Sequence, residues 1–220
     1  MVPSLSHVAV LVRSAKDAAN VCKASEWELG PVEDFPSEGT REIYVGPSAT
    51  DALLLLMEAI GPGPYRNALE KRGPGLHHVA VNVASIDDYV ASLAGSGWLL
   101  HPASLHTLAH RKTVYLARPG LSALIEVQQP GDSSTGRPRF ISDVFIEGDR
   151  EHERLLDALR VPGLRLAGKE GARLVIGRRR IALADLARDR ERSGSRRRRK
   201  AHPKMEKPVR PHGRTGFSRG

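Results

Sequence analysis

Several features that define common protein classes are scarce or absent in this chain of 220 residues. It has one cysteine, Cys22, so no disulfide can form within the chain, and we expect a cytoplasmic protein. No apolar run approaches the ~20 residues that a membrane-spanning helix needs. Residues 1–7 contain no basic segment followed by an apolar one, so we expect no secretory signal. The 40% of hydrophobic and 27% of charged residues are typical of a soluble globular protein.

The folded part of the chain also lacks an excess of charge. The net charge of +9 lies entirely in residues 191–220, which hold 11 Lys and Arg against 2 Asp and Glu. The high isoelectric point therefore describes a basic tail. We expect residues 188–220 to be disordered, because they cannot bury enough apolar surface to offset the entropy lost on ordering. Such a tail can contact nucleic acid or anionic surfaces non-specifically, through phosphate groups.

The first part of the chain alternates strand-like and helix-like patterns. Residues 5–13 are apolar and rich in valine, which predicts a buried strand. Ser14 is suited to cap the helix that follows. The predicted elements are strands over 5–13, 40–46 and 52–59, helices over 15–25 and 64–72, and a turn-rich segment over 31–39.

The pattern then restarts. The sequence LHHVAVNV at 76–83 matches LSHVAVLV at 5–12, so His78 takes the place of His7 in a second copy. The same offset relates Leu55 to Glu126, each late in the last strand of its copy. This agreement predicts an internal duplication; chance similarity of two valine-rich strands is the alternative. The second copy is predicted to hold strands over 76–83, 98–101, 111–117 and 122–128, and a helix that starts after Ser85.

The two copies predict an α+β fold of paired β-α-β-β-β modules over residues 3–130, with modules at 3–60 and 74–130. Residues 129–139 have the composition of a linker. Residues 139–187 are predicted to form a partial third αβ module, in an element order like that of the first copy. An odd number of modules leaves an open sheet edge, so we expect a homodimer.

Three residues on predicted strands form a candidate metal site. The duplication relates His7 to His78, and paired modules would bring equivalent strand positions to one cavity. Imidazole nitrogen and carboxylate oxygen suit a divalent transition metal. Glu126 lies in an apolar strand, where an unpartnered charge is costly to bury. From the residues alone, histidines held by hydrogen bonds and a glutamate facing solvent stay open as the alternative.

Five segments resemble the vicinal oxygen chelate superfamily, whose members include glyoxalase I, methylmalonyl-CoA epimerase and extradiol dioxygenases. Residues 5–128 are most similar to the methylmalonyl-CoA epimerase branch. The run LEKRGPGLHH at 69–78 is fairly specific to that branch, whereas the other segments are common across the superfamily. The segments are 7–10, 36–39, 56–61, 69–81 and 124–126.

The resemblance implies a metal bound between the two modules. Its ligands would be a histidine and a glutamine or glutamate from the first module, and a histidine and a glutamate from the second. His7, His78 and Glu126 match three of these positions, with His78 rather than His77 preceding the apolar strand as His7 does. The implied ion is divalent cobalt, nickel, manganese or zinc. The fourth position falls on Leu55, which cannot bind a metal.

The resemblance also implies an isomerase that moves a proton α to the thioester of a small acyl-CoA or similar oxyanionic substrate. One carboxylate would act on each face of the substrate. Glu126 matches one of them. The other belongs to a turn that here reads PSEG, with the glutamate displaced by one residue, so Glu38 is the candidate. The loss of a ligand at Leu55 leaves open whether this activity is impaired.

Two further hypotheses fit the residues. Two histidines and one carboxylate form the iron site of extradiol dioxygenases, and Tyr115, His106 and His110 loosely resemble the second-module pattern of those enzymes. Alternatively, the modules form a non-catalytic scaffold that binds a small ligand or only pairs with itself. A leucine in place of a ligand is what relaxed constraint on a metal site would produce.

Overall fold

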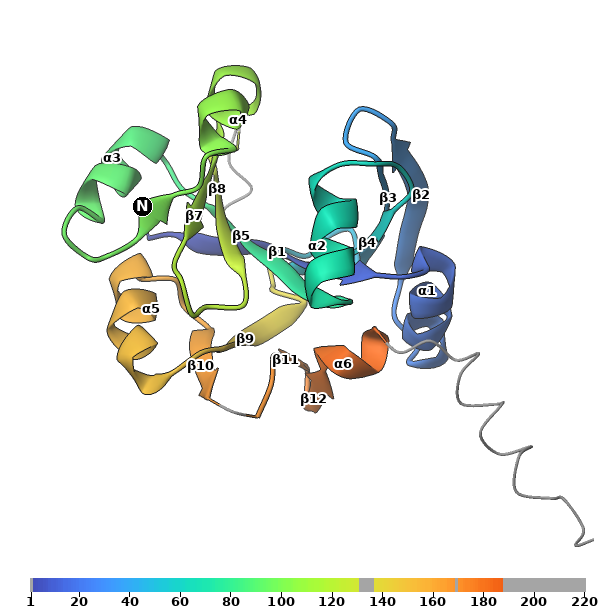
Figure 1. Cartoon of the computed structure of the whole chain (residues 1–220). Coiled ribbons are helices and arrows are strands. Elements are labelled where there is room, and N and C mark those ends of the chain that lie inside the picture. The colour runs from blue at the N-terminus through green and yellow to red at the C-terminus, as the bar shows by residue number, and fades with distance from the viewer. Residues whose placement is uncertain (1, 131–136, 169, 188–220) are drawn as a thin grey trace, which may run out of the picture. The chain divides into compact units, whose positions relative to one another are not determined.

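The computed structural model describes residues 2–130, 137–168 and 170–187 (Figure 1). The basic tail predicted over 188–220 lies outside the described residues. The first module begins with a strand that is apolar on both faces and continues into a helix whose first turn is capped by Ser14, the acceptor from the Asp17 backbone N–H. Its elements are β1 (Ser4–Val12), α1 (Ala15–Ala24), β2 (Leu29–Phe35), β3 (Thr40–Val45) and β4 (Leu53–Ala59).

The second module repeats this order after the connecting helix α2 (Pro64–Arg72). Ser85 caps its helix by accepting from the Asp88 backbone N–H, as Ser14 does in the first module. Its elements are β5 (Gly75–Asn82), α3 (Ile86–Ser92), β6 (Leu99–Leu100), α4 (Ser104–Arg111), β7 (Thr113–Ala117) and β8 (Leu124–Gln128).

The two modules share one eight-stranded sheet in the order β2-β3-β4-β1-β5-β8-β7-β6. In each module the first strand pairs in parallel with the last, β1 with β4 and β5 with β8. The modules meet where β1 pairs antiparallel with β5. This is the predicted α+β fold of paired β-α-β-β-β modules, and it places the two valine-rich strands side by side at the centre (Figure 1).

The residue pairs across the strands of the first module recur in the second module, shifted along the chain by the offset between His7 and His78. His7 lies opposite Leu53 as His78 lies opposite Leu124. Farther out, Tyr44 pairs with Leu55 and Tyr115 pairs with Glu126. The predicted duplication therefore holds strand by strand. As a result, Leu55 and Glu126 occupy equivalent places on the same face of the sheet.

Residues after the linker form a second, four-stranded sheet with two short helices. Its elements are β9 (Ile141–Glu147), the 3-10 turn Arg150–His152, α5 (Glu153–Leu159), β10 (Leu164–Gly168), β11 (Arg173–Ile176), β12 (Arg179–Ala182) and α6 (Leu183–Leu186). A strand, a helix and three strands follow one another along the chain, which is the element order of the first module. However, the strand order is β10-β9-β11-β12, so β9 pairs in parallel with the strand directly after its helix. The pairing differs from that of the two modules, and this appended unit is no third copy of them.

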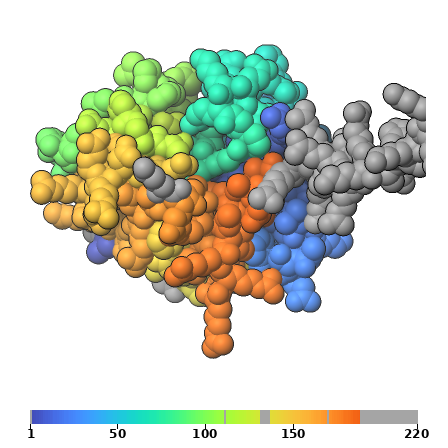
Figure 2. Space-filling model, turned by 60° about the horizontal axis from the view of Figure 1, so that its bottom comes forward, coloured from blue at the N-terminus to red at the C-terminus, as the bar shows by residue number. Residues whose placement is uncertain are grey.

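The appended unit contacts both modules at equivalent tryptophans. The ring of Trp27 packs edge-on against Phe140, at 5.9 Å between centroids. Trp98, its counterpart in the second module, donates its indole N–H to the Leu155 carbonyl at 2.8 Å. Strands and helices from all three parts contribute to one large hydrophobic core. Figure 2 shows the appended unit, yellow to orange, lying against the green and teal segments of the modules.

Two local predictions are wrong. Residues 31–39 were expected to be turns, but β2 occupies the first part of that segment and tolerates Pro31 because it is an edge strand. Helix α4 was not expected, and it lies where the sequence offers no acidic first turn and no side-chain cap. Strand β2 is largely exposed, so its sequence carries little of the apolar alternation on which the prediction of a strand depends.

Candidate metal centre

Three predicted residues from three different strands converge on one buried point. His7 lies on β1, His78 on β5 and Glu126 on β8. The Nε2 atoms of the two histidines are 3.2 Å apart, and Glu126 Oε2 lies 2.9 Å from His78 Nε2 and 3.9 Å from His7 Nε2. All three side chains are buried. The donor atoms lie within the distances that one ion can bridge.

Two β-bulges bring the histidines to this point. In the pairing of β1 with β5, Ser6 is an extra residue on β1 and His77 is an extra residue on β5. A bulge shifts the alternation of side chains by one residue. Leu5 and Val8 therefore both face the large core, although they are three residues apart. The histidine after each bulge consequently points to the opposite face, toward the other module.

A short hydrogen-bonded network surrounds the three donors. The Gln128 side-chain amide donates to Glu126 Oε1 at 2.9 Å, which leaves Oε2 for the centre. Ser6 Oγ donates to the Gln128 side-chain carbonyl at 3.5 Å and lies 3.4 Å from His7 Nδ1. On the other side, His77 Nδ1 lies 2.9 Å from His78 Nδ1. His77 was set aside in favour of His78 and given no role of its own, although the doubled histidine after Leu76 was the available signal.

The electrostatics favour neutral His7 and His77 side chains and an ionised Glu126 carboxylate. Burial, together with the nearby His78, lowers the pKa of His7 to about 4. Burial and the charges of His78 and Arg72 lower the pKa of His77 to about 3. Burial alone would raise the pKa of Glu126, but the hydrogen bond from His78 and the charges of the two histidines outweigh it, and the pKa is lowered to about 2. Neutral imidazole and ionised carboxylate are the forms that bind metals.

The fourth predicted ligand position is filled by packing. Leu55 is buried and belongs to a small apolar cluster with Ala9, Leu11 and Met57 on the face of the sheet that carries the centre. The equivalents of Leu55 and Met57 in the second module are Glu126 and Gln128. The centre is therefore lopsided: one donor comes from the first module and two come from the second.

Glu58 does not replace the missing ligand. The pairing of β4 with β1 and β3 has no bulge, so Glu58 faces the opposite side of the strand from Leu55. Its carboxylate accepts the Ala15 backbone N–H at 2.8 Å, at the start of α1. In the second module the Gln129 side-chain carbonyl accepts the Ile86 N–H at the start of α3 in the same way, at 3.3 Å. Glu58 thus has a structural role that the duplication repeats.

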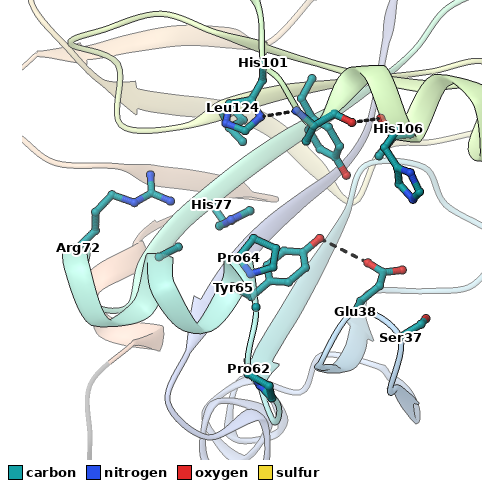
Figure 3. A pocket seen from close by; sticks show the side chains of 15 residues that line it. Ser37, Glu38, Pro62, Pro64, Tyr65, Arg72, His77, His101, His106 and Leu124 are labelled. Carbon is teal, nitrogen blue, oxygen red and sulfur yellow. Dashed lines mark hydrogen bonds between the residues drawn. The ribbon is translucent and has the colours of Figure 1, made fainter.

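A cavity of about 570 Å³ lies next to residues that contact the centre, and Figure 3 shows the side chains that line it. His77 forms part of its wall and connects it to His78. Tyr115, on the strand next to Glu126, lines it as well, with its ring centroid 6.2 Å from that of His78. The remaining wall combines polar and apolar side chains from α2, α4, the loops around them and the start of β8, including Arg72, His101, His106, Thr107, Pro62, Pro64, Ala68 and Leu124. His110, by contrast, contacts His106 but is not part of the wall.

Glu38, the second predicted catalytic carboxylate, lines this cavity but is not part of the three-residue centre. Gly39 has a φ of +70°, and a Cβ there would lie 3.0 Å from the Pro62 carbonyl, so the turn packs closely against the loop before α2. Tyr65, on α2, donates its hydroxyl to Glu38 Oε2 at 3.4 Å. Its ring also contacts His77, at 5.1 Å between centroids. Figure 3 shows Tyr65 between His77 and Glu38.

A third carboxylate near the centre was missed by sequence analysis. Glu42 and Tyr44 alternate along β3 on the same face as Leu55, and the Tyr44 ring lies 5.8 Å from that of His7. Thr40 donates its hydroxyl to Glu42 Oε1 at 3.0 Å. Burial raises the pKa of Glu42, and the charges of Glu38 and Glu126 add to that effect. No signal in the sequence separated Glu42 from an exposed strand glutamate.

Comparisons with known proteins concern the fold. Neither a protein-family model nor a curated protein sequence matches the chain. No helix among the described residues is both long and apolar enough to cross a bilayer. Solved structures that resemble the chain include a hypothetical protein from Bacillus halodurans (22% identity, TM-score 0.49, 62% of this chain and 100% of that one). Methylmalonyl-CoA epimerase from Mycobacterium tuberculosis is similar at 21% identity and a TM-score of 0.44, over 58% and 87% of the two chains.

The epimerase from Streptomyces coelicolor, solved in complex with 2-nitronate-propionyl-CoA, is also similar. Its identity is 16% and its TM-score 0.46, over 57% of this chain and 97% of that chain. These likenesses are at the level of the fold. The chain's own coordinates give it two paired β-α-β-β-β modules that share one sheet through β1 and β5.

Proposed function

We propose that the protein is a metal-assisted isomerase that moves a proton α to the carbonyl of a small acyl thioester, as the resemblance to methylmalonyl-CoA epimerase implies. The observation that carries the proposal is the convergence of two Nε2 atoms and one carboxylate oxygen at a buried point beside a cavity. A second carboxylate, Glu38, lines the same cavity. Proton transfer next to a carbonyl needs this combination of a site for the developing charge and groups that move the proton.

The donor set fits a divalent transition metal. Among the described residues, the ion-pair partners of buried Glu126 are the two histidines, both aimed at it through Nε2. Imidazole nitrogen with carboxylate oxygen suits cobalt, nickel, manganese or zinc. When bound by His7, His78 and Glu126, such an ion would supply positive charge that stabilises a developing enolate oxygen.

The protein's own side chains would orient the substrate and move the proton. Glu38 is the candidate base or acid at the cavity wall, where the Tyr65 hydroxyl fixes one of its oxygens. Glu126 would act from the other face, and Gln128 holds its Oε1, which leaves Oε2 beside the two histidines. The apolar part of the wall would exclude water from the acyl group.

One observation favours a second candidate. With Leu55 at the fourth position, the centre is a set of two histidines and one carboxylate, which is also the iron site of oxygenases. Tyr115 and His106, the residues that loosely resemble the extradiol dioxygenase pattern, both line the cavity. A ring-cleaving dioxygenase is therefore the alternative function.

Metal analysis of the full chain, with His78→Ala as the variant, separates these proposals. Cobalt, nickel, manganese or zinc that is lost in the variant supports the isomerase. Ferrous iron together with oxygen uptake on catechols supports the dioxygenase. A chain that binds none of these metals above the variant's background contradicts both and leaves the non-catalytic scaffold.

Deuterium exchange tests the proton transfer directly. The protein should incorporate solvent deuterium at the α-carbon of methylmalonyl-CoA. Glu38→Gln should slow the exchange by about 10²-fold or more, the usual contribution of a general acid or base. Glu28→Gln changes an exposed glutamate of the same module and is the matched control. An unchanged exchange rate in Glu38→Gln would remove Glu38 from the proposal.

A further inference from the structure

We infer that Ser6 and His77, the extra residues of the two β-bulges, are positioning residues for the metal centre. Each holds the Nδ1 side of the next histidine, so that its Nε2 atom faces Glu126. The inference rests on the metal site of the proposed function and deepens it. It explains why both modules carry a bulge at the same place, since Ser6 and His77 are related by the same offset as His7 and His78.

In the second module the contact joins two imidazoles. His77 Nδ1 and His78 Nδ1 are 2.9 Å apart, with the ring planes at 78°. Two ring nitrogens at this distance share one proton, because one must donate and the other must accept. A rotation of the His78 ring would break this hydrogen bond and turn Nε2 away from Glu126. The pair therefore fixes which nitrogen of His78 is available to the centre.

His77 is itself held firmly enough to act as a support. It is only 8% exposed, and its ring lies between the rings of Tyr65 and His78, at 5.1 and 5.2 Å between centroids. Tyr65 in turn contacts Glu38. A continuous line of contacts thus leads from the cavity carboxylate Glu38 through His77 to the centre.

In the first module a hydroxyl takes the same position. Ser6 Oγ lies 3.5 Å from the Gln128 carbonyl and 3.4 Å from His7 Nδ1, and when its single proton goes to Gln128 it accepts from His7 Nδ1. His7 then carries its proton on Nδ1 and presents the bare Nε2 lone pair to the centre. The Gln128 side-chain amide in turn donates a hydrogen bond to Glu126 Oε1 and so restrains the Glu126 carboxylate as well. Outer partners of this kind typically change metal affinity by about 10–100-fold.

Cobalt binding to the EDTA-treated full chain tests the inference, measured by competition with a chelator. His77→Ala should weaken Co²⁺ binding by about 10–100-fold. His77→Asn should stay within about threefold of the wild type, because an asparagine amide occupies the place of Nδ1. Lys23→Ala, which changes an exposed side chain of α1 that binds no metal, is the control and should leave affinity unchanged. Equal Co²⁺ affinity in His77→Ala and the wild type would overturn the inference.

Two further measurements keep the test decisive. In EDTA-treated protein with ¹⁵N-labelled histidine, His78 should show a single tautomer in the wild type and in His77→Asn, and a mixture in His77→Ala. A wild type that binds no Co²⁺ but shows this pattern refutes the proposed function and keeps the positioning role. A single tautomer in His77→Ala refutes the role. If His77→Ala does not fold, His77→Asn is compared with His77→Gln, whose amide reaches the position of the His77 Nε2 atom instead of Nδ1. His77→Asn should then bind Co²⁺ about tenfold more tightly than His77→Gln. Equal affinities of the two variants would refute the positioning role of His77.

Discussion

Leu55 is the residue at which the centre departs most from the pattern it resembles. Its backbone place is equivalent to that of Glu126, and its side chain lies in the apolar cluster beside the centre. Leu55→Gln should therefore add a fourth donor and raise Co²⁺ affinity by about tenfold or more. The unliganded variant should lose roughly 1–3 kcal/mol of unfolding free energy, because a polar group replaces a packed leucine. Chelator competition and urea unfolding measure the two effects, and a folded variant with unchanged affinity would contradict the equivalence.

The buried histidines also make a prediction about pH. His7 and His77 have folded pKa values of about 4 and about 3, below the ordinary 6.5. At a pH below 6.5 and above these folded pKa values, the histidines are protonated in the unfolded chain but not in the folded one. The unfolding free energy therefore falls as the pH falls from about 6.5. The slope reaches up to ~1.4 kcal/mol per pH unit for each histidine. Glu126, whose folded pKa is lowered, loses its contribution only below about pH 4.5, so between about pH 6.5 and pH 5 it does not add to this slope.

Urea unfolding of EDTA-treated protein between about pH 7 and pH 5 measures this slope. His77→Asn removes one of the two groups and should flatten it. A stability that does not change over this range, or a slope that is the same in the variant, would show that His77 becomes protonated as easily in the folded chain as in the unfolded one.

At the scale of single elements, the sequence predicted the strands that build the centre but not the bulges within them. Valine-rich runs are unambiguous strands, and the repeated histidine marked equivalent places. The bulges, however, depend on how β1 pairs with β5, a contact between segments that are far apart in the chain. The spacing of three between the core residues Leu5 and Val8 was the one local sign of a break in strand alternation. His77 was therefore given no role, whereas His7, His78 and Glu126 could be selected from the sequence.

Strand alternation also decides the role of Glu58, and this can be tested. Glu58→Ala removes the acceptor of the Ala15 N–H at the start of α1. The loss of an anionic cap at a helix N-terminus should lower the unfolding free energy by roughly 1–2 kcal/mol. Co²⁺ affinity should stay within about threefold of the wild type, because Glu58 faces away from the centre. A tenfold loss of affinity with unchanged stability would instead make Glu58 a ligand.

For the molecule as a whole, the sequence predicted the paired modules but not how the appended unit is built. The duplication predicted the topology of the two modules, because equivalent segments must pair equivalently. The appended unit follows the same element order, yet β9 pairs directly with β10, and no local pattern distinguishes that pairing from the one in the modules. The unit contacts the first module at Trp27 and the second at Trp98. It therefore fixes the modules against each other on the side of the sheet opposite the apolar cluster that holds Leu55.

In this arrangement, metal binding at the centre does not depend on the expected homodimer. His7, His78 and Glu126 all belong to one chain, and β1 pairs with β5 within it, so the site is complete without a second copy. Co²⁺ affinity and the rate of α-deuterium exchange per chain should therefore stay constant as the protein is diluted through the range in which sedimentation shows any dimer dissociating. A fall in affinity that follows the loss of dimer would mean that a second chain completes or orders the centre. Because the two modules are joined covalently and held by the appended unit, we expect dilution to change the sedimentation coefficient alone.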